Sequence, residues 1–200
     1  MSITIEPLTG DALAAALPDL ARLRIAVFRD WPYLYDGRLE YEQDYLAKFA
    51  KSRDAVVVAA RDGDVIVGVA TASPLREHTE RFAPLFADLG FDPERIFYFG
   101  ESVLLSAYRG RGIGHAFFDH REAHARICRA SAKPFTHSAF CAVVRPADHP
   151  ARPATYVPLD AFWTKRGYVR QDGMLGAYSW QDIGAVEETE KPMQFWMKSL

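Results

Sequence analysis

The segment SAYRGRGIGHAFF, residues 106–118, combines bare backbone with positive charge. Glycines stand at positions 110, 112 and 114, with Arg109 and Arg111 among them. Because glycine has no side chain, its backbone N–H can approach a ligand closely. Residues that favour a helix follow in HAFFDHREAHARI, which places the glycines at a helix N-terminus. Free N–H groups and the helix dipole attract anions there, so the segment predicts a phosphate site.

The spacing of these glycines excludes two common nucleotide-binding motifs. A dinucleotide-binding fingerprint needs G-x-G-x-x-G, but His115 or Phe117 stands where the third glycine belongs. A P-loop needs a lysine followed by serine or threonine, which this segment lacks. The residues alone leave two alternatives: an anion-binding turn, or a glycine-rich turn that only connects a strand to a helix.

Composition predicts one globular domain with a small partner. The 200 residues carry 24 basic and 26 acidic side chains, for a formal charge of −2. This balance gives no general attraction to nucleic acid or to anionic membranes. No apolar run approaches the ~20 residues of a membrane span. The N-terminal MSITIEPLTG also lacks a signal-peptide pattern, so we expect a cytoplasmic protein.

The cysteines and histidines form no recognisable metal motif. Cys128 and Cys141 have no CxxC spacing and are too few for a disulfide framework, so we expect buried thiols. HREAH, residues 120–124, differs from the zinc-protease motif because its glutamate is third rather than second. We therefore expect no metal, and histidines that lie on a helix surface or in the core: His115, His120 and His124.

The elements before the glycines alternate between strand and helix patterns. SITIEPL predicts a strand, followed by helical DALAAAL and PDLARLRIAVFRD, the second beginning at Pro18. RLEYEQDYLAKFAK predicts another helix, and an Asp-Gly turn joins AVVVAA to VIVGVATA in a hairpin. Residues 74–95 form an insertion with one short helix, and IFYFGESVLL is the strand that leads into the glycines.

The second half continues this alternation. We expect the helix after the glycines to bury a stripe that includes His120, together with Ala116, Ala123, Ile127 and Ala130. HSAFCAVV predicts a fifth strand, and a proline-rich loop follows it. LDAFWTKR is a short helix that Gly167 ends, and MLGAYSW and PMQFWMKS predict two last strands.

The order of a strand, Arg-x-x-Gly-x-Gly and a helix resembles the GNAT superfamily of acyl-CoA-dependent N-acyltransferases. The two helices after the first strand, the hairpin, and AFWTKRGY, which is similar to that family's Phe-Tyr-x-x-x-Gly-Phe, extend the resemblance over essentially all 200 residues. It implies an α/β (α+β) fold with a mixed central sheet of about seven strands, flanked by helices and splayed between the fourth and fifth strands. Residues 1–200 would then form a single GNAT-like N-acetyltransferase domain.

The resemblance implies acetyl-CoA as co-substrate, without a metal. Backbone N–H groups from Arg109 to Gly114 would cradle the pyrophosphate, and Leu104 and Leu105 would pair by backbone with the pantetheine arm. The thioester would lie between the splayed strands, with Trp163 beside its sulfur. The implied cofactor-binding residues of this turn are Arg109, Gly110, Arg111, Gly112, Ile113, Gly114 and His115.

The implied reaction is N-acetyl transfer by direct attack of a primary amine in a ternary complex. It needs a neutral amine, a stabilised oxyanion and a departing thiolate. Glu101, near the end of the signature strand, is the candidate base, acting directly or through water. The alternative is a structural carboxylate paired with Arg24 or Arg29. A backbone N–H near Leu104 is the candidate oxyanion donor.

One departure from the family concerns the leaving group. Trp163 stands where many relatives carry the tyrosine that protonates the thiolate, and an indole N–H is not a practical acid. Tyr156 is a candidate replacement, with a water or unassisted departure as equal alternatives, whereas Tyr168 is expected in the core. A GNAT-fold protein that binds or senses acyl-CoA without acetyl transfer is therefore the alternative function. A scaffold whose glycines only turn the chain is a remoter one.

The acceptor side is expected to involve residues 30–45, DWPYLYDGRLEYEQDY. In related folds the loop between the first two helices lines the acceptor side, so acidic and aromatic residues here would attract a cationic amine of a small molecule or a peptide N-terminus. A solvated helix face is the alternative. The oligomeric state stays open, with a homodimer as one option. The acidic residues are Asp30, Asp36, Glu40, Glu42 and Asp44.

Overall fold

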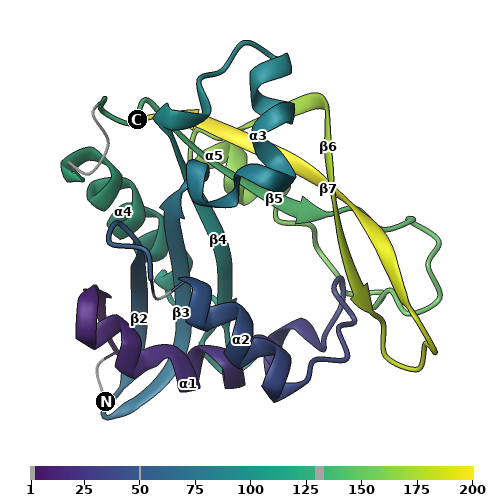
Figure 1. The fold of residues 1–200 in the computed structure, drawn as a ribbon. Coiled ribbons are helices and arrows are strands. Elements are labelled where there is room, and N and C mark those ends of the chain that lie inside the picture. The colour runs from purple at the N-terminus through teal and green to yellow at the C-terminus, as the bar shows by residue number, and fades with distance from the viewer. Residues whose placement is uncertain (1–2, 50, 129–132) are drawn as a thin grey trace.

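The computed structural model describes residues 3–49, 51–128 and 133–200. In these ranges seven strands form one sheet in the order β1-β2-β3-β4-β5-β7-β6 (Figure 1). The β4–β5 pair is parallel and the other neighbours are antiparallel, which confirms the expected mixed sheet. The strands are β1 (Ile3–Leu8), β2 (Val56–Asp62), β3 (Val65–Pro74), β4 (Ile96–Leu104), β5 (His137–Val143), β6 (Val169–Gln181) and β7 (Glu188–Ser199).

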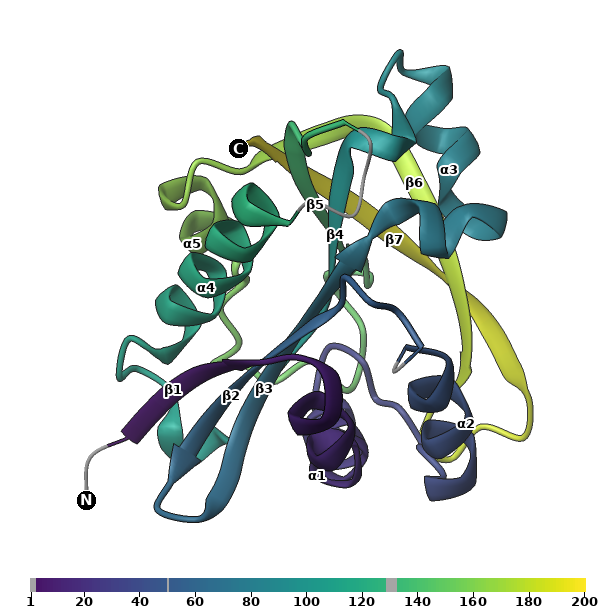
Figure 2. The ribbon, with the colours of Figure 1, turned by 60° about the vertical axis from the view of Figure 1, so that its left-hand side comes forward.

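Helices cover both faces of this sheet. Figure 2 shows α1, α2 and α3 on one side of the strands and α4 and α5 on the other. Within the described ranges no helix is both long and apolar enough to cross a membrane. The helices are α1 (Gly10–Phe28), α2 (Leu39–Phe49), α3 (Thr79–Asp88), α4 (Ile113–Ile127) and α5 (Asp160–Lys165), with short 3₁₀ turns η1 (Leu75–His78), η2 (Pro93–Arg95) and η3 (Ser106–Tyr108).

The first helix does not restart at Pro18, as the sequence predicted. It runs without a break through Pro18, whose side chain is exposed. Proline removes one backbone donor and crowds the preceding turn. Here the ring faces solvent, while the buried side chains of Leu13, Ala16 and Leu20 form one stripe across it. Burial of that stripe against the sheet offsets the lost hydrogen bond.

The buried face of α4 also differs from the predicted stripe. Ala123 is exposed and Ile127 is 71% exposed, while His120 is only partly covered. Ala130 lies outside the described residues. The bulky phenylalanines set the orientation of the helix, which brings two charged side chains to the inner face. The buried residues are Ile113, Phe117, Phe118, Arg121, Glu122 and Ala125.

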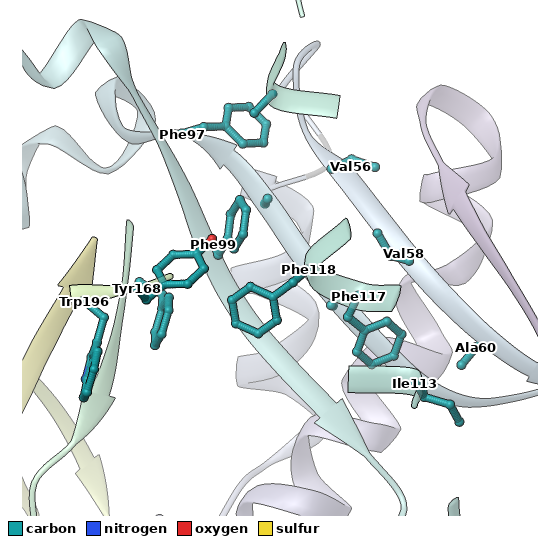
Figure 3. Packing of buried hydrophobic residues seen from close by; sticks show 14 of the residues in the cluster. Val56, Val58, Ala60, Phe97, Phe99, Ile113, Phe117, Phe118, Tyr168 and Trp196 are labelled. Atoms are coloured by element: carbon teal, nitrogen blue, oxygen red, sulfur yellow. The ribbon is translucent and has the colours of Figure 1, made fainter. Parts of the chain in front are cut away.

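An aromatic core fills the space between the sheet and α4. Figure 3 shows Phe99, Phe118 and Tyr168 in one cluster, with ring centroids of Phe118 and Tyr168 5.1 Å apart. Tyr168 is 1% exposed and its hydroxyl lies 2.8 Å from Ser138 Oγ, which confirms its expected place in the core. This cluster packs beside the region where β4 and β5 separate.

The expected splay between the fourth and fifth strands is present. β4 pairs with β5 at three positions only, from Ile96↔His137 to Tyr98↔Ala139. Beyond these pairs β4 continues along β3, and β5 continues along β7. The two strands therefore leave a gap on the way to Leu104, directly before the glycine segment.

Candidate active site

The glycine segment forms a turn whose backbone conformation strongly favours glycine at two positions. Gly110 has φ of 76° and Gly112 has φ of 81°, in the left-handed region that disfavours other residues. Gly112 is also the N-cap of α4. Gly114 has ordinary dihedrals, and a Cβ there would lie 3.5 Å from Phe162 Cζ of α5. The turn therefore presents backbone rather than side chains at the start of α4.

Backbone N–H groups of this turn lack acceptors. Within the described part of the chain, the five N–H groups of residues 110–114 donate no hydrogen bond. The N–H of Arg109, expected to join them, donates to Ser106 O at 3.1 Å, because η3 closes there. The N–H of His115 donates to Gly112 O at 3.0 Å. Five successive donors at the positive end of α4 form an arrangement suited to an anion.

The two arginines of the turn lie at its surface. Arg109 Nε donates to Leu104 O at 3.4 Å, and Arg111 Nη2 donates to Ala107 O at 3.0 Å. The Arg111 guanidinium also lies 5.1 Å from the centre of the Tyr108 ring. Both side chains are exposed. Both guanidinium groups therefore place positive charge at the turn.

The backbone of β4 alternates between β3 and the gap. Leu105 N donates to Val67 O at 3.1 Å and Leu105 O accepts from Tyr108 N, so both of its backbone groups are engaged inside the chain. Leu104 faces Gly68 in the register, in a non-hydrogen-bonded pair. Its N–H and C=O therefore point away from β3, toward the gap. Of the two expected partners of pantetheine, Leu104 is the one whose backbone groups are directed away from β3, and its C=O accepts from Arg109 Nε at 3.4 Å.

A β-bulge in β4 places Glu101. Ala70 pairs with Ser102 but Ala72 pairs with Phe99, so Gly100 and Glu101 both lie opposite Thr71. Glu101 N donates to Thr71 Oγ1 at 3.1 Å, and a Cβ on Gly100 would lie 2.6 Å from that oxygen. The extra residue turns the Glu101 side chain toward α1. A glycine inside a strand pattern is a signal for such a bulge.

Glu101 forms an ion pair with α1. The side chain of Glu101 is 7% exposed, and Arg24 Nη1 lies 2.9 Å from its Oε1. Of the two partners expected for a structural carboxylate, Arg24 is therefore the one present. Arg29 instead lies 3.3 Å from Asp36 at the surface.

A buried hydroxyl and a buried thiol lie where β4 and β5 separate. Tyr98 Oη on β4 lies 3.1 Å from Cys141 Sγ on β5 and connects the strands where they separate. Burial raises the pKa of the Cys141 thiol to about 12, so it stays protonated near neutral pH. The Glu101 carboxylate and burial raise the pKa of Tyr45 well above its ordinary value. These groups are hydrogen-bond donors rather than acids at neutral pH.

Tyr156 and Trp163 contact different groups of aromatic residues. Tyr156 contacts Trp31 edge-on, at 5.9 Å between ring centroids, and burial raises its pKa. Burial raises the pKa of Tyr33 above its ordinary value, and Cys141 and Tyr156 add to this shift. Trp163 packs on Phe140 of β5, at 5.1 Å, against the core below α4 and α5.

The acidic segment 30–45 does not lie at the surface as one group. Glu42 is 0% exposed and forms an ion pair with Arg24, so the expectation that it faces the acceptor from the surface is wrong. The reason is a partner on the preceding helix, which the segment itself does not reveal. Asp36 and Glu40 remain accessible. The side chain of Asp44 lies outside the described residues.

A clamp around Arg145, which the sequence did not predict, fixes the loop after α1. Arg145 Nη2 donates to Tyr33 O at 2.7 Å and Nε donates to Pro32 O at 2.9 Å. The same guanidinium holds both carboxylate oxygens of Asp182, at 2.8 and 2.9 Å. The loop between α1 and α2 is thus tied to the end of β6. No local pattern signals a contact between segments so far apart in sequence.

Two further observations concern metal ligands and surface grooves in the described residues. In the part of the chain that the structure describes, no cluster of His, Cys, Asp or Glu could hold a metal ion. A groove lined by Pro84 and Leu85 of α3 and by Leu175 of β6 includes none of the candidate residues.

Comparison with known proteins identifies the family. Residues 20–139 match the model of the Acetyltransferase (GNAT) family. A ribosomal-protein-alanine N-acetyltransferase from Brucella melitensis shares 18% identity with a TM-score of 0.60, over 98% of this chain and 99% of that one. Arabidopsis thaliana NAA60, solved in complex with acetyl-CoA, shares 15% identity with a TM-score of 0.61, over 100% and 99% of the two chains.

A third solved structure shows the same fold. Salmonella typhimurium yncA, described as a putative acetyltransferase with its cofactor acetyl-CoA, shares 12% identity with a TM-score of 0.57, over 100% of this chain and 95% of that one. A comparison with curated proteins gives no match. At these identities the structural likeness supports the fold alone, while the family match covers more than half of the sequence. The chain therefore belongs to the GNAT acetyltransferase family.

Proposed function

We propose that the protein is an N-acetyltransferase that moves an acetyl group from acetyl-CoA to a primary amine by direct attack in a ternary complex. One observation carries this proposal: five backbone N–H groups without acceptors, at residues 110–114, next to the gap between β4 and β5. Residues 1–200 act in this proposal as a single domain. The acceptor is a small-molecule amine or a peptide N-terminus, in the cytoplasm, with no nucleic acid or membrane as partner.

The residues at the turn fit acetyl-CoA. The pyrophosphate would accept hydrogen bonds from the N–H groups of residues 110–114, while Arg109 and Arg111 add positive charge. The backbone of Leu104 faces the gap and can pair with an amide of the pantetheine arm. His115, in the first turn of α4, is exposed beside this path.

The chemistry then depends on the acceptor face of β4. Glu101 takes a proton from the attacking amine, directly or through water, as the new C–N bond forms. The N–H of Leu104 donates to the oxygen that becomes negative. As the carbon–sulfur bond breaks, the thiolate leaves and takes a proton from Tyr156 or from water. Trp163 packs beside the sulfur without donating a proton.

A protein that binds or senses acyl-CoA without transfer is the second candidate. It is favoured by Trp163, which occupies the place of the family's usual acid and packs between aromatic rings of β5 and β7. A loss of the acid would leave the anion site intact and remove one catalytic group. Both candidate functions require binding of acetyl-CoA, and only the first includes transfer of its acetyl group.

The test is release of free CoA thiol from acetyl-CoA, with mass spectrometry of the acceptor. We would use a panel that includes spermidine, tyramine and the peptide Ala-Ala-Ala, because the site carries acidic and aromatic groups. We expect one or more panel amines to gain an acetyl group. Binding of acetyl-CoA without acetylation of any amine would favour the second candidate, and no binding would contradict both.

A further inference from the structure

Arg24 lies between two buried carboxylates on the acceptor side of the sheet. Its Nη1 is 2.9 Å from Glu101 Oε1 on β4, and its Nε donates to Glu42 Oε2 on α2. The side chain of Glu42 is 0% exposed and that of Glu101 is 7% exposed. Two carboxylates thus share one guanidinium, away from most of the solvent.

Groups on three elements hold Arg24 in this place. Tyr35 Oη donates to Glu42 Oε1 at 2.8 Å, which fixes the carboxylate that orients Arg24. The guanidinium lies 4.7 Å from the centre of the Tyr45 ring and 5.2 Å from that of Phe28. A guanidinium is planar and presents its donors in a fixed fork, so it can pair with two carboxylates while its face stacks on rings.

The electrostatics around Glu101 come from several elements. Burial alone would lower the pKa of Arg24, but Glu101, Tyr45 and Glu42 raise it above its ordinary value, so the guanidinium stays charged. Arg121 of α4 donates to the backbone oxygen of Glu101 at 3.4 Å, and burial lowers its pKa to about 10. The charge of Glu101 also contributes to the raised pKa values of Tyr33 and Tyr45. Arg24 is the cation that contacts the carboxylate itself.

We propose that Arg24 is a positioning residue for acetyl transfer, which holds Glu101 by Oε1 and places a positive charge beside its carboxylate, and that Glu42 limits this effect by sharing the guanidinium. The inference rests on the proposed function, in which Glu101 is the base. Oε2 of Glu101 accepts no hydrogen bond from the described residues and is the oxygen available to the amine.

Substitutions of Arg24 and of Glu42 should shift the acidic midpoint of the kcat/KM profile in opposite directions. In Arg24→Met, Glu101 loses the cation that favours its charged form, so it takes up a proton at higher pH. The acidic midpoint of the kcat/KM profile should rise by about one pH unit or more. In Glu42→Gln, the negative charge of Glu42 is removed and Arg24 pairs with Glu101 alone. The acidic midpoint of the kcat/KM profile should therefore fall. A purely structural role for the cluster would lower activity without this pattern.

The experiment measures pH profiles of kcat/KM with acetyl-CoA and the panel amine that is turned over. Arg24→Lys is included because it keeps the charge; we expect a midpoint between those of the parent and Arg24→Met. Arg29→Met is the matched control, since Arg29 lies on the same helix and pairs with Asp36 at the surface. It should leave the midpoint unchanged. Midpoints that coincide in the parent, Arg24→Met and Glu42→Gln would overturn the proposal.

A second readout does not depend on turnover. Infrared titration of the carboxylates can identify the band of Glu101 by its loss in Glu101→Gln. We expect that band to titrate at higher pH in Arg24→Met and at lower pH in Glu42→Gln than in the parent. An unshifted band would reject the positioning role even if no amine of the panel is acetylated. Absence of turnover with shifted bands would reject only the proposed function.

Discussion

The glycine turn (residues 110–114) and the Arg24 cluster (Arg24, Glu42 and Glu101) are built in different ways. The turn is made of consecutive residues, and its contacts stay within a few positions, as from Arg109 N to Ser106 O. The cluster joins α1, α2 and β4 through side chains, with Arg24 and Glu42 18 positions apart. The first site uses backbone N–H groups, which most side-chain substitutions leave in place. The second depends on charges that a single substitution can remove.

This difference indicates which part of the proposed reaction each region is suited to perform. Backbone donors at a helix N-terminus suit a constant group, such as the pyrophosphate that every acyl-CoA carries. Side chains brought together by tertiary packing suit the acceptor and the proton transfer, which vary between enzymes of one fold. Changes in the two regions should therefore separate the binding of acetyl-CoA from the chemical step.

The largest expected effect is that of Glu101→Gln on turnover. The amide cannot take the amine proton, so kcat should fall by about 10²-fold or more, the usual scale of general base catalysis. The acidic limb of the pH profile should flatten, and acetyl-CoA affinity should stay near that of the parent. Steady-state kinetics over pH and calorimetric titration measure these quantities.

The control for Glu101→Gln is Glu6→Gln, because Glu6 pairs with Arg61 in an exposed pair on the edge strand β1. It should leave kcat unchanged. If Glu101→Gln retains both its turnover and its acidic limb, Glu101 is a structural carboxylate paired with Arg24 and the comparison between the two regions fails.

A smaller effect is expected from Asp36→Asn. Asp36 remains accessible in the acidic segment, where it would attract a cationic amine over a distance that salt screens. We expect the acceptor KM to rise about two- to five-fold, as for a surface charge pair, and to rise with added salt. The KM for acetyl-CoA should respond differently because its phosphates meet arginines. A neutral acceptor, or a KM indifferent to both changes, would remove residues 30–45 from the acceptor side.

The smallest expected effect is that of Trp163→Phe. The indole packs on Phe140 and Trp196, at 5.1 and 5.2 Å between ring centroids, so the substitution should reduce stability more than turnover. We expect kcat to change less than about threefold, within the range of lost packing alone. Thermal unfolding and kcat measured on the same preparation separate the two. A fall in kcat of several orders of magnitude with intact folding would assign the indole N–H a part in the chemistry.

The sequence predicted the sheet and the turn because their signals are local. The Asp-Gly turn between β2 and β3, the apolar strand that enters the gap and the glycines at positions 110 and 112 each specify a backbone conformation. The splay followed from the family resemblance rather than from the residues. It depends on β5 leaving β4 after Tyr98↔Ala139, which no local pattern reveals.

The acceptor side was less predictable because it depends on tertiary contacts. Arg24 was foreseen only as one of two alternative partners of Glu101, and Glu42 was placed with the exposed acids. The clamp between Arg145 and Asp182 joins residues 37 positions apart and had no signal. The stripe of α4 was misplaced because the buried Arg121 has apolar rings on either side: its guanidinium lies 4.3 Å from the centre of Phe99 and 4.9 Å from that of Phe118. Hydrophobic periodicity does not predict a charge stacked in this way.

Calorimetric titration of acetyl-CoA into the parent and Gly112→Asp tests the central claim most directly. The new carboxylate would meet the pyrophosphate, and Gly112 has φ of 81°, so we expect affinity at least about tenfold weaker, equivalent to about 1.4 kcal/mol. Gly63→Asp is the matched control, because Gly63 has φ of 60° in the turn between β2 and β3. It should bind acetyl-CoA as the parent does. Equal affinity of the parent and Gly112→Asp would contradict the assignment of the turn, and with it the proposed function.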